Sequence, residues 1–200
     1  MKILSAEFAR SGARAEDLID DGALEVAFAG RSNVGKSSLM NRLLGTKLAR
    51  TSSTPGRTQT VNYFRINRKF WFVDLPGYGY ARAARSDRER WAKVVTSYLE
   101  RDPSRRLLVQ LVDAKVGATP LDAQAAEYFT GLGVRRIVVA TKADKLKRGE
   151  RAAALAGIHA ALALGEEAVL LPVSAVSGEG MRELWKSITD FLAGQIPPEP

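Results

Sequence analysis

The sequence predicts an α/β fold: a doubly wound, mostly parallel six-stranded sheet with one antiparallel strand and helices on both faces. Three observations lead to this prediction. Short apolar runs alternate with helical patterns along almost the whole chain. Most of these runs are too apolar for strands that expose one face. Two runs stand only two residues apart, as in a hairpin. With 200 residues, 46% hydrophobic and 26% charged, the chain suits one globular domain.

Six apolar runs are the expected strands. The first, residues 25–29, ends at Gly30. Residues 60–66 alternate between polar and apolar side chains, and a two-residue Asn-Arg turn separates them from residues 69–73, so these two runs form the antiparallel hairpin. The remaining strands are almost wholly apolar, as in parallel strands covered on both faces, and cover residues 107–112, 137–140 and 169–173.

Five helical patterns lie between and after these strands. They cover residues 39–44, 88–99, 120–129, 151–164 and 181–192. Gly45 ends the first helix, and Pro120 begins the third. We expect three tryptophans at apolar positions to lie in the core: Trp71, Trp91 and Trp185. His159, on the fourth helix, is expected to be structural or exposed.

The composition excludes several chemistries. The sequence has no cysteine and one histidine, which rules out disulfides, thiol nucleophiles and Cys- or His-rich metal centres. No apolar run approaches the ~20 residues that span a bilayer. Glu7 interrupts the only apolar stretch near the N-terminus, which argues against a secretory signal. We expect a cytoplasmic protein with no membrane contact, and take a monomer as the default.

Positive charge is concentrated in the middle of the chain. The net charge is +8, and residues 48–106 alone hold 13 Lys and Arg against 5 Asp and Glu. Clustered arginines, among them Arg82, Arg85 and Arg88, favour a polyanion partner such as nucleic acid. The alternative is a solvated helix face in a basic protein.

The segment Gly30-Arg-Ser-Asn-Val-Gly-Lys-Ser37 fits the phosphate-loop pattern GxxxxGK[ST]. It follows an expected strand and opens an expected helix, which is the context that the chemistry requires. Its glycines let the backbone wrap around phosphates, while loop amides and the helix N-terminus face the negative charge. Lys36 is expected to reach the outer phosphates, and the Ser37 hydroxyl to hold Mg²⁺.

Three later elements favour guanine. Asp74-Leu-Pro-Gly77 ends a strand, which places Asp74 to bind Mg²⁺ through water and the Gly77 amide to sense a third phosphate. In Thr141-Lys-Ala-Asp144 the Asp144 carboxylate can accept both N–H groups of guanine, a donor pair that adenine lacks, and the Lys142 stem can pack over the base. After the last strand, the Ala175 amide can bind the guanine carbonyl. Each motif alone also fits an ordinary loop or turn, but all lie at the carboxyl ends of strands, along one sheet edge.

A candidate switch segment, Thr54-Pro-Gly-Arg-Thr-Gln-Thr60, lies between the phosphate loop and Asp74. A hydroxyl here would complete the Mg²⁺ shell and couple the order of the loop to the third phosphate. We take Thr58 as the first candidate. Thr54 and Thr60 are alternatives, because spacing cannot separate them.

The chain here resembles a known family. Gly30-Arg-Ser-Asn-Val-Gly-Lys-Ser-Ser38, Ser53-Thr-Pro-Gly-Arg-Thr-Gln-Thr60, Asp74-Leu-Pro-Gly-Tyr-Gly-Tyr-Ala81 and Thr141-Lys-Ala-Asp144 are similar to the EngB (YihA/YsxC) family of bacterial GTPases, of the TrmE-Era-EngA-EngB-Septin-like superfamily. The similarity spans nearly the whole chain, and its Gly-Tyr-Gly-Tyr-Ala segment is the most family-specific part. It implies a Ras-like P-loop GTPase domain that assists assembly of the large ribosomal subunit and is needed for normal division and septation. It also assigns Mg²⁺ to Ser37 and Thr58.

The motifs and the resemblance together give the candidate site. Catalytic roles fall to Lys36, Thr58 and Gly77, and metal ligation to Ser37, Thr58 and Asp74. The residues expected to bind GTP or GDP are Gly30, Arg31, Ser32, Asn33, Val34, Gly35, Lys36, Ser37, Ser38, Gly56, Arg57, Thr58, Gln59, Thr60, Asp74, Leu75, Pro76, Gly77, Thr141, Lys142, Ala143, Asp144, Val173, Ser174 and Ala175.

The expected domain division places the GTPase domain at residues 22–195. An acidic N-terminal extension, residues 1–21, precedes it, and a Pro-rich tail, residues 196–200, follows. The resemblance is poor at both ends, so it assigns no function to either segment.

One group is missing from the expected active site. Many GTPases carry a glutamine directly after the DxxG glycine, where it orients the attacking water, whereas this chain has Tyr78. We expect slow hydrolysis by the free protein, with the ribosomal particle or a cation supplying the missing group. In some related GTPases an asparagine at the position of Asn33 ligates K⁺; the alternative is that Asn33 only braces the loop.

Two questions about partners and turnover stay open at this stage. Tyr78 and Tyr80 can stack on RNA bases or simply belong to a mobile switch loop. The functional alternative to a switch enzyme is a guanine-nucleotide-dependent RNA- or ribosome-binding module with negligible turnover.

Overall fold

The structure, a computed structural model, describes residues 2–49, 60–78 and 85–195, and only the backbone of residues 85–91 and 195. These residues form seven strands and five α-helices. In chain order they are β1 (Ala6–Gly12), β2 (Glu25–Gly30), α1 (Lys36–Leu44), β3 (Val61–Ile66), β4 (Phe70–Asp74), α2 (Arg85–Leu99), β5 (Arg106–Asp113), α3 (Pro120–Gly131), β6 (Arg135–Thr141), α4 (Arg151–Ala161), β7 (Val169–Pro172) and α5 (Met181–Gln195).

All strands belong to one sheet with the order β1-β3-β4-β2-β5-β6-β7. Strand β3 pairs antiparallel with both β1 and β4, and the other neighbours pair parallel, so β3 alone runs against the rest. The α/β, doubly wound fold with one antiparallel strand from the hairpin is confirmed. The expected number of six strands is wrong, because β1 adds a seventh strand at the edge.

The N-terminal segment is fastened to this edge by polar side chains. Asn67, in the hairpin turn, accepts a hydrogen bond from the Leu4 amide at 2.7 Å through its side-chain oxygen. Asp21 accepts the indole N–H of Trp71 at 3.0 Å and pairs with Arg65 at 2.9 Å. Through β1 the N-terminal segment therefore belongs to the same sheet as the rest of the chain, while the domain boundary at residue 21 stays a prediction.

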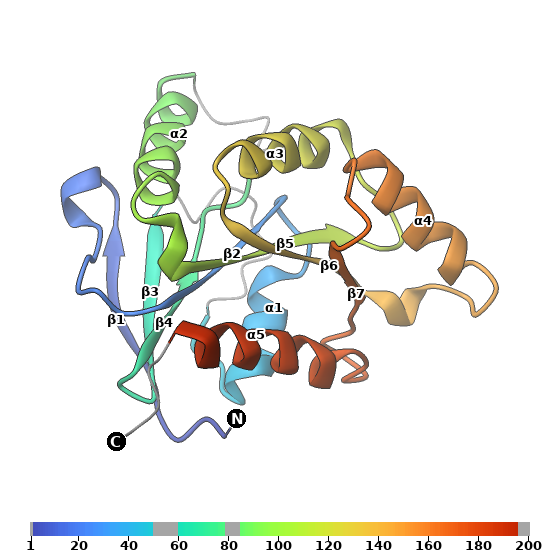
Figure 1. The fold of residues 1–200 in the computed structure, drawn as a ribbon, viewed down its shortest axis with the longest axis horizontal. Coiled ribbons are helices and arrows are strands. Elements are labelled where there is room, and N and C mark those ends of the chain that lie inside the picture. Colours follow the sequence, from blue (N-terminus) through green and yellow to red (C-terminus); the bar gives the residue numbers. More distant parts are fainter. Residues whose placement is uncertain (1, 50–59, 79–84, 196–200) are drawn as a thin grey trace.

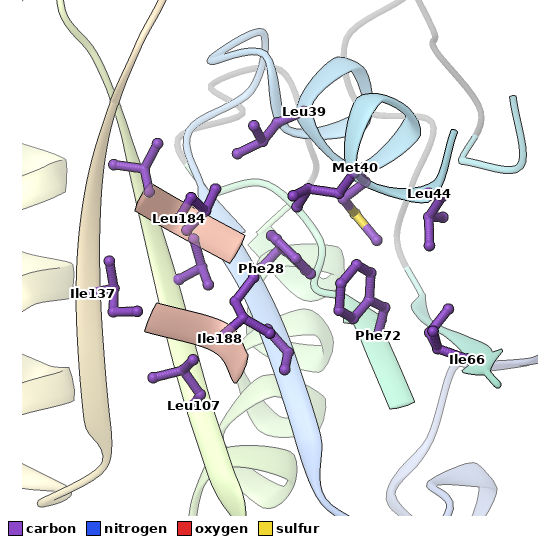
Figure 2. Packing of buried hydrophobic residues seen from close by; sticks show 14 of the residues in the cluster. Phe28, Leu39, Met40, Leu44, Ile66, Phe72, Leu107, Ile137, Leu184 and Ile188 are labelled. Carbon is purple, nitrogen blue, oxygen red and sulfur yellow. The ribbon is translucent and has the colours of Figure 1, made fainter. Parts of the chain in front are cut away.

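Helices cover both faces of the sheet (Figure 1). Buried side chains of α1 and α5 pack on one face, and those of α2, α3 and α4 on the other. Figure 2 shows the first of these cores, in which Phe28 and Phe72 project from neighbouring strands towards the helices. Their rings meet edge to face at 4.9 Å between centroids, and burying each contributes ~1.5–3 kcal/mol.

Of the two tryptophans whose side chains are described, Trp71 lies in the core as expected, whereas Trp185 is half-buried and packs against the core. Trp71 is buried against the second core, and Trp185 stacks on Phe72 with centroids 5.9 Å apart. The side chain of Trp91 lies outside the described residues. His159 is half-buried on α4.

The helices occupy the expected places, with two earlier starts. Helix α1 begins at Lys36 rather than residue 39, and α2 at Arg85 rather than residue 88. Helix α4 ends at Ala161, earlier than the expected residue 164. Among the described residues, no helix is long and apolar enough to cross a membrane. The carboxyl ends of β2, β4, β5, β6 and β7 lie along one edge of the sheet, which is where the candidate site forms.

Candidate nucleotide-binding site

The phosphate loop joins β2 to α1 and depends on two glycines. A Cβ at Gly30 would lie 2.9 Å from a Val34 methyl carbon and 3.0 Å from the Leu111 main-chain oxygen, so no larger residue fits. Gly35 has φ of +103°, a left-handed conformation that lets the chain turn into the helix. The first amides of α1, including those of Ser37 and Ser38, have no carbonyl partners within the helix and can bind an anion.

Lys36 and Asp74 come together although 38 positions separate them. Asp74 ends β4 beside Phe28 of β2, which brings its carboxylate next to the start of α1. The Lys36 ammonium forms an ion pair and hydrogen bond with this carboxylate, and their side chains are only 10% and 7% exposed. Two nearly buried charges need a partner, so the predicted phosphate-binding and metal-binding groups are each other's counter-ion here.

The segment after Asp74 is pinned to the phosphate loop. The Tyr78 amide donates to the Gly30 carbonyl at 3.3 Å, and the Ser32 amide donates to the Tyr78 carbonyl at 3.2 Å. A Cβ on Gly77 would lie 3.2 Å from the Ser32 nitrogen. The two residues before Gly77, Leu75 and Pro76, are buried. The close approach of the two loops therefore favours glycine at position 77.

The Tyr78 side chain turns towards helix α3. Its hydroxyl donates to Asp122 Oδ1 at 2.9 Å. Burial, together with the charge of Asp122, raises the pKa of Tyr78 far above its ordinary value, so the hydroxyl stays a donor. In this arrangement the half-buried Tyr78 side chain contacts Asp122, and whether it stacks on RNA bases stays an open prediction. Tyr80 lies outside the described residues.

On the base side of the site, Thr141 and Lys142 fasten β6 to the phosphate loop. The buried Thr141 hydroxyl lies 2.6 Å from the Val34 carbonyl oxygen. Lys142, with a left-handed φ of 57°, donates from Nζ to the Asn33 carbonyl at 2.9 Å and to Asp113 Oδ2 at 2.7 Å. The Lys142 side chain therefore reaches the phosphate loop through its ammonium group, while the packing of its stem on a base stays a prediction.

Asp113 is a site residue that sequence reasoning missed. It ends β5 at the same edge of the sheet, and an acid directly after a buried strand was the signal available. Burial acts to raise its pKa, but the hydrogen bond from Lys142 and the amides of Lys115 and Val116 outweigh burial, so the pKa of Asp113 is lowered. The carboxylate stays charged and fixes the Lys142 ammonium.

The predicted guanine-reading acid is oriented by the last strand's loop. The Ser174 hydroxyl donates to Asp144 Oδ1 at 2.5 Å. The Asp144 side chain is exposed, and its other oxygen, Oδ2, is not the one that Ser174 binds. The Ala143 amide donates to the Val173 carbonyl at 3.2 Å and so ties the two loops together. Ala175 follows Ser174 and is half-buried. Ser174, expected only as a nucleotide contact, also positions Asp144.

Part of the predicted switch lies outside the described residues: Thr54, Gly56, Arg57, Thr58 and Gln59. The catalytic and metal-binding roles of Thr58 therefore stay predictions. The Thr60 hydroxyl, just before β3, donates to the Asn62 side-chain oxygen at 3.1 Å. Arg31 pairs through its backbone with Tyr78.

The donors present suit Mg²⁺ only if other ligands join them. Ser37 and Asp74 offer hard oxygen atoms at the start of α1 and the end of β4. No group of three His, Cys, Asp or Glu side chains able to hold a metal occurs among the described residues. One carboxylate, hydroxyls, water and phosphate oxygens form a typical Mg²⁺ shell at a nucleotide site, so the residues fit the ion in the presence of phosphates.

Comparison with known proteins agrees with this geometry. A family model described as "50S ribosome-binding GTPase" matches residues 25–142. A solved structure titled as a probable GTP-binding protein engB has a TM-score of 0.69 at 23% identity, with 86% of this chain and 99% of that chain covered, which supports the fold. Era in complex with MgGDPNP and nucleotides 1506–1542 of 16S ribosomal RNA has a TM-score of 0.69 at 26% identity, with 89% of this chain and 59% of that chain covered. The fold and the site define a GTP-binding P-loop GTPase.

Curated relatives narrow this class. The chain is 41% identical over 191 residues to the probable GTP-binding protein EngB of Clostridioides difficile (strain 630), with 95% of this chain and 94% of the relative covered. It is 46% identical over 189 residues to that of Pelotomaculum thermopropionicum, with 94% and 96% covered. The chain belongs to the EngB family of GTP-binding proteins, which confirms the resemblance inferred from its motifs.

Proposed function

We propose that this GTPase is a Mg²⁺-dependent molecular switch that acts in assembly of the large ribosomal subunit, through contact with ribosomal RNA, and that normal cell division and septation depend on it. The observation that carries the switch is the convergence of the phosphate loop, Gly77, Lys142 and Asp144 on one sheet edge. The ribosomal partner is supported by the description of the matching family model and by the net charge of +8. We propose that the protein works in the cytoplasm as a monomer.

In the proposed complex, the α1 amides and Lys36 bind the phosphates, while Asp144 accepts the two N–H groups of guanine. The Lys36 ammonium would exchange Asp74 for a phosphate. Ser37 and Asp74, with Thr58 as the third candidate, would hold Mg²⁺, which supplies positive charge across the phosphates. The Gly77 amide would bind the third phosphate and so distinguish GTP from GDP.

We further propose that hydrolysis by the free protein is slow. The Tyr78 hydroxyl is engaged with Asp122 and cannot orient water as a glutamine amide does. The ribosomal particle, or K⁺ at Asn33, would supply the missing group. The Asn33 side chain is exposed, which suits a cation ligand, although its left-handed φ of 65° alone also favours asparagine. Equal turnover in K⁺ and Na⁺ buffers of the same ionic strength would rule out the cation.

The test is GTP turnover by the purified protein with and without large-subunit particles, in K⁺ buffer, with small-subunit particles as the matched control. We expect stimulation of ~100-fold or more by large-subunit particles alone, since one added transition-state group can contribute 10³-fold or more. Tight GTP-dependent particle binding without turnover would favour the binding-module alternative. Absence of binding would contradict the ribosomal role.

A further inference from the structure

We propose that Tyr78 is a positioning residue for recognition of the third phosphate: its hydroxyl, anchored on Asp122 of α3, holds the Gly77 amide against the phosphate loop. This inference rests on the proposed role of Gly77. It assigns the tyrosine, which stands where many GTPases have a water-orienting glutamine, to discrimination between GTP and GDP.

Tyr78 is held at three points. Its amide and carbonyl bond to Gly30 and Ser32 at 3.3 and 3.2 Å, and its hydroxyl bonds to Asp122 at 2.9 Å. On the other side of Gly77, the Leu75 amide donates to the Phe28 carbonyl at 3.1 Å. Gly77 therefore lies between two residues whose main chain is hydrogen-bonded to β2 and the phosphate loop, Leu75 and Tyr78. Of these two, Tyr78 is also held by a hydrogen bond of its side chain.

Asp122 is a rigid anchor for this hydroxyl. The residue is 1% exposed, and its Oδ2 accepts the Thr119 amide at 2.8 Å and the Thr119 hydroxyl at 2.6 Å. Its carbonyl accepts a hydrogen bond from the buried Gln110 amide group at 3.0 Å. The Tyr78 hydroxyl bonds to the other carboxylate oxygen, Oδ1. Because a buried carboxylate oxygen without a partner is costly, the hydroxyl is kept in place and the main chain of Tyr78 with it.

The consequence is specific to one nucleotide. GDP has no third phosphate and makes no use of the Gly77 amide, whereas GTP gains from an amide already in position. Loss of the anchor should therefore lower the ratio of GTP affinity to GDP affinity. A merely structural role would weaken both nucleotides together.

The test is Tyr78→Phe, measured by titration with GDP and with a non-hydrolysable GTP analogue, beside thermal unfolding. We expect analogue affinity to fall ~10-fold, with GDP affinity changed less than about twofold, because one buried hydrogen bond is lost. The matched control is Tyr128→Phe, on helix α3 with Asp122, where the tyrosine hydroxyl lies 3.2 Å from that of Thr96. It should leave the ratio unchanged.

Two further variants separate the possible failures. Asp122→Asn keeps an oxygen for Tyr78 but replaces Oδ2, the one acceptor of both Thr119 hydrogen bonds, by an amide nitrogen, so it should lower the melting temperature and preserve the ratio. If both Tyr78→Phe and Asp122→Asn lower the ratio of GTP-analogue affinity to GDP affinity, each in proportion to its loss of melting temperature, the positioning role is overturned. Gly77→Ala tests the proposed role of Gly77 itself. If Gly77→Ala leaves the affinity ratio unchanged, the role of Gly77 is refuted. If Gly77→Ala lowers the ratio but Tyr78→Phe does not, only the positioning role of Tyr78 is refuted.

Discussion

Replacing Ser174 by alanine should weaken the binding of every guanine nucleotide, because the Ser174 hydroxyl orients Asp144. Ser174 is 0% exposed, and its hydroxyl donates to Asp144 at 2.5 Å. The same hydroxyl oxygen accepts hydrogen bonds from the amides of Val176 and Ser177 at 3.2 and 3.0 Å. A hydrogen bond to a charged group contributes ~1.5–3 kcal/mol. Since Asp144 is exposed and water replaces part of this, we expect a loss of ~1–2 kcal/mol, which is ~5–30-fold in Kd.

The assay is equilibrium titration with fluorescent GDP and GTP analogues, together with thermal unfolding of the nucleotide-free protein. Ser177→Ala is the matched control, because its exposed hydroxyl lies 3.4 Å from the Glu179 amide and does not reach Asp144. An unchanged Kd for Ser174→Ala would refute the reasoning. An equal loss in Ser177→Ala would show that the loop as a whole matters rather than this hydroxyl.

Three other perturbations test separate parts of the account. Thr141→Val removes the buried donor to the phosphate loop and should lower the free energy of unfolding by ~1–3 kcal/mol in a denaturant titration, while Thr141→Ser should retain most of it. The pKa of Asp113 in the folded protein lies below the ordinary value of 3.8, so the charged carboxylate stabilises the fold fully above pH 3.8, and this stabilisation is lost as the pH falls through the folded-state pKa. Asp113→Asn should therefore reduce the loss of stability at acid pH in a pH–stability profile. An unchanged acid part of the profile would contradict this. Reversing the charges of Arg85 and Arg88 should weaken binding to large-subunit particles and flatten its salt dependence at unchanged GTP affinity; a loss of GTP affinity would mean that these arginines support the pocket.

The sheet was predictable wherever burial imposes a pattern. Strands covered on both faces need apolar runs, and residues 137–140 show such a run without interruption. Strand β1 was missed because nearly all of its side chains are exposed, apart from partial contacts such as Phe8 on Phe64 with rings 5.7 Å apart. Its existence depends on pairing with β3, a contact distant in sequence that local patterning cannot reveal.

The site was predictable in its loops but not in its pairings. The glycine and lysine positions follow from how a backbone must wrap a phosphate, so the phosphate loop could be found from spacing alone. The pairing of Lys36 with Asp74, and of Tyr78 with Asp122, joins residues 38 and 44 positions apart. No spacing rule connects such residues, because the order of the strands decides which loops and helix starts become neighbours at this edge.

The most direct test of the account is the base preference of Asp144→Asn. The amide replaces one acceptor with a donor, which suits the C2 carbonyl of xanthine and opposes the amine of guanine. We predict that competition binding will show guanine affinity reduced ~100-fold or more, with xanthine nucleotides now preferred. A variant that still prefers guanine nucleotides as the wild type does would contradict the assignment of Asp144 and, with it, the arrangement of nucleotide along this sheet edge.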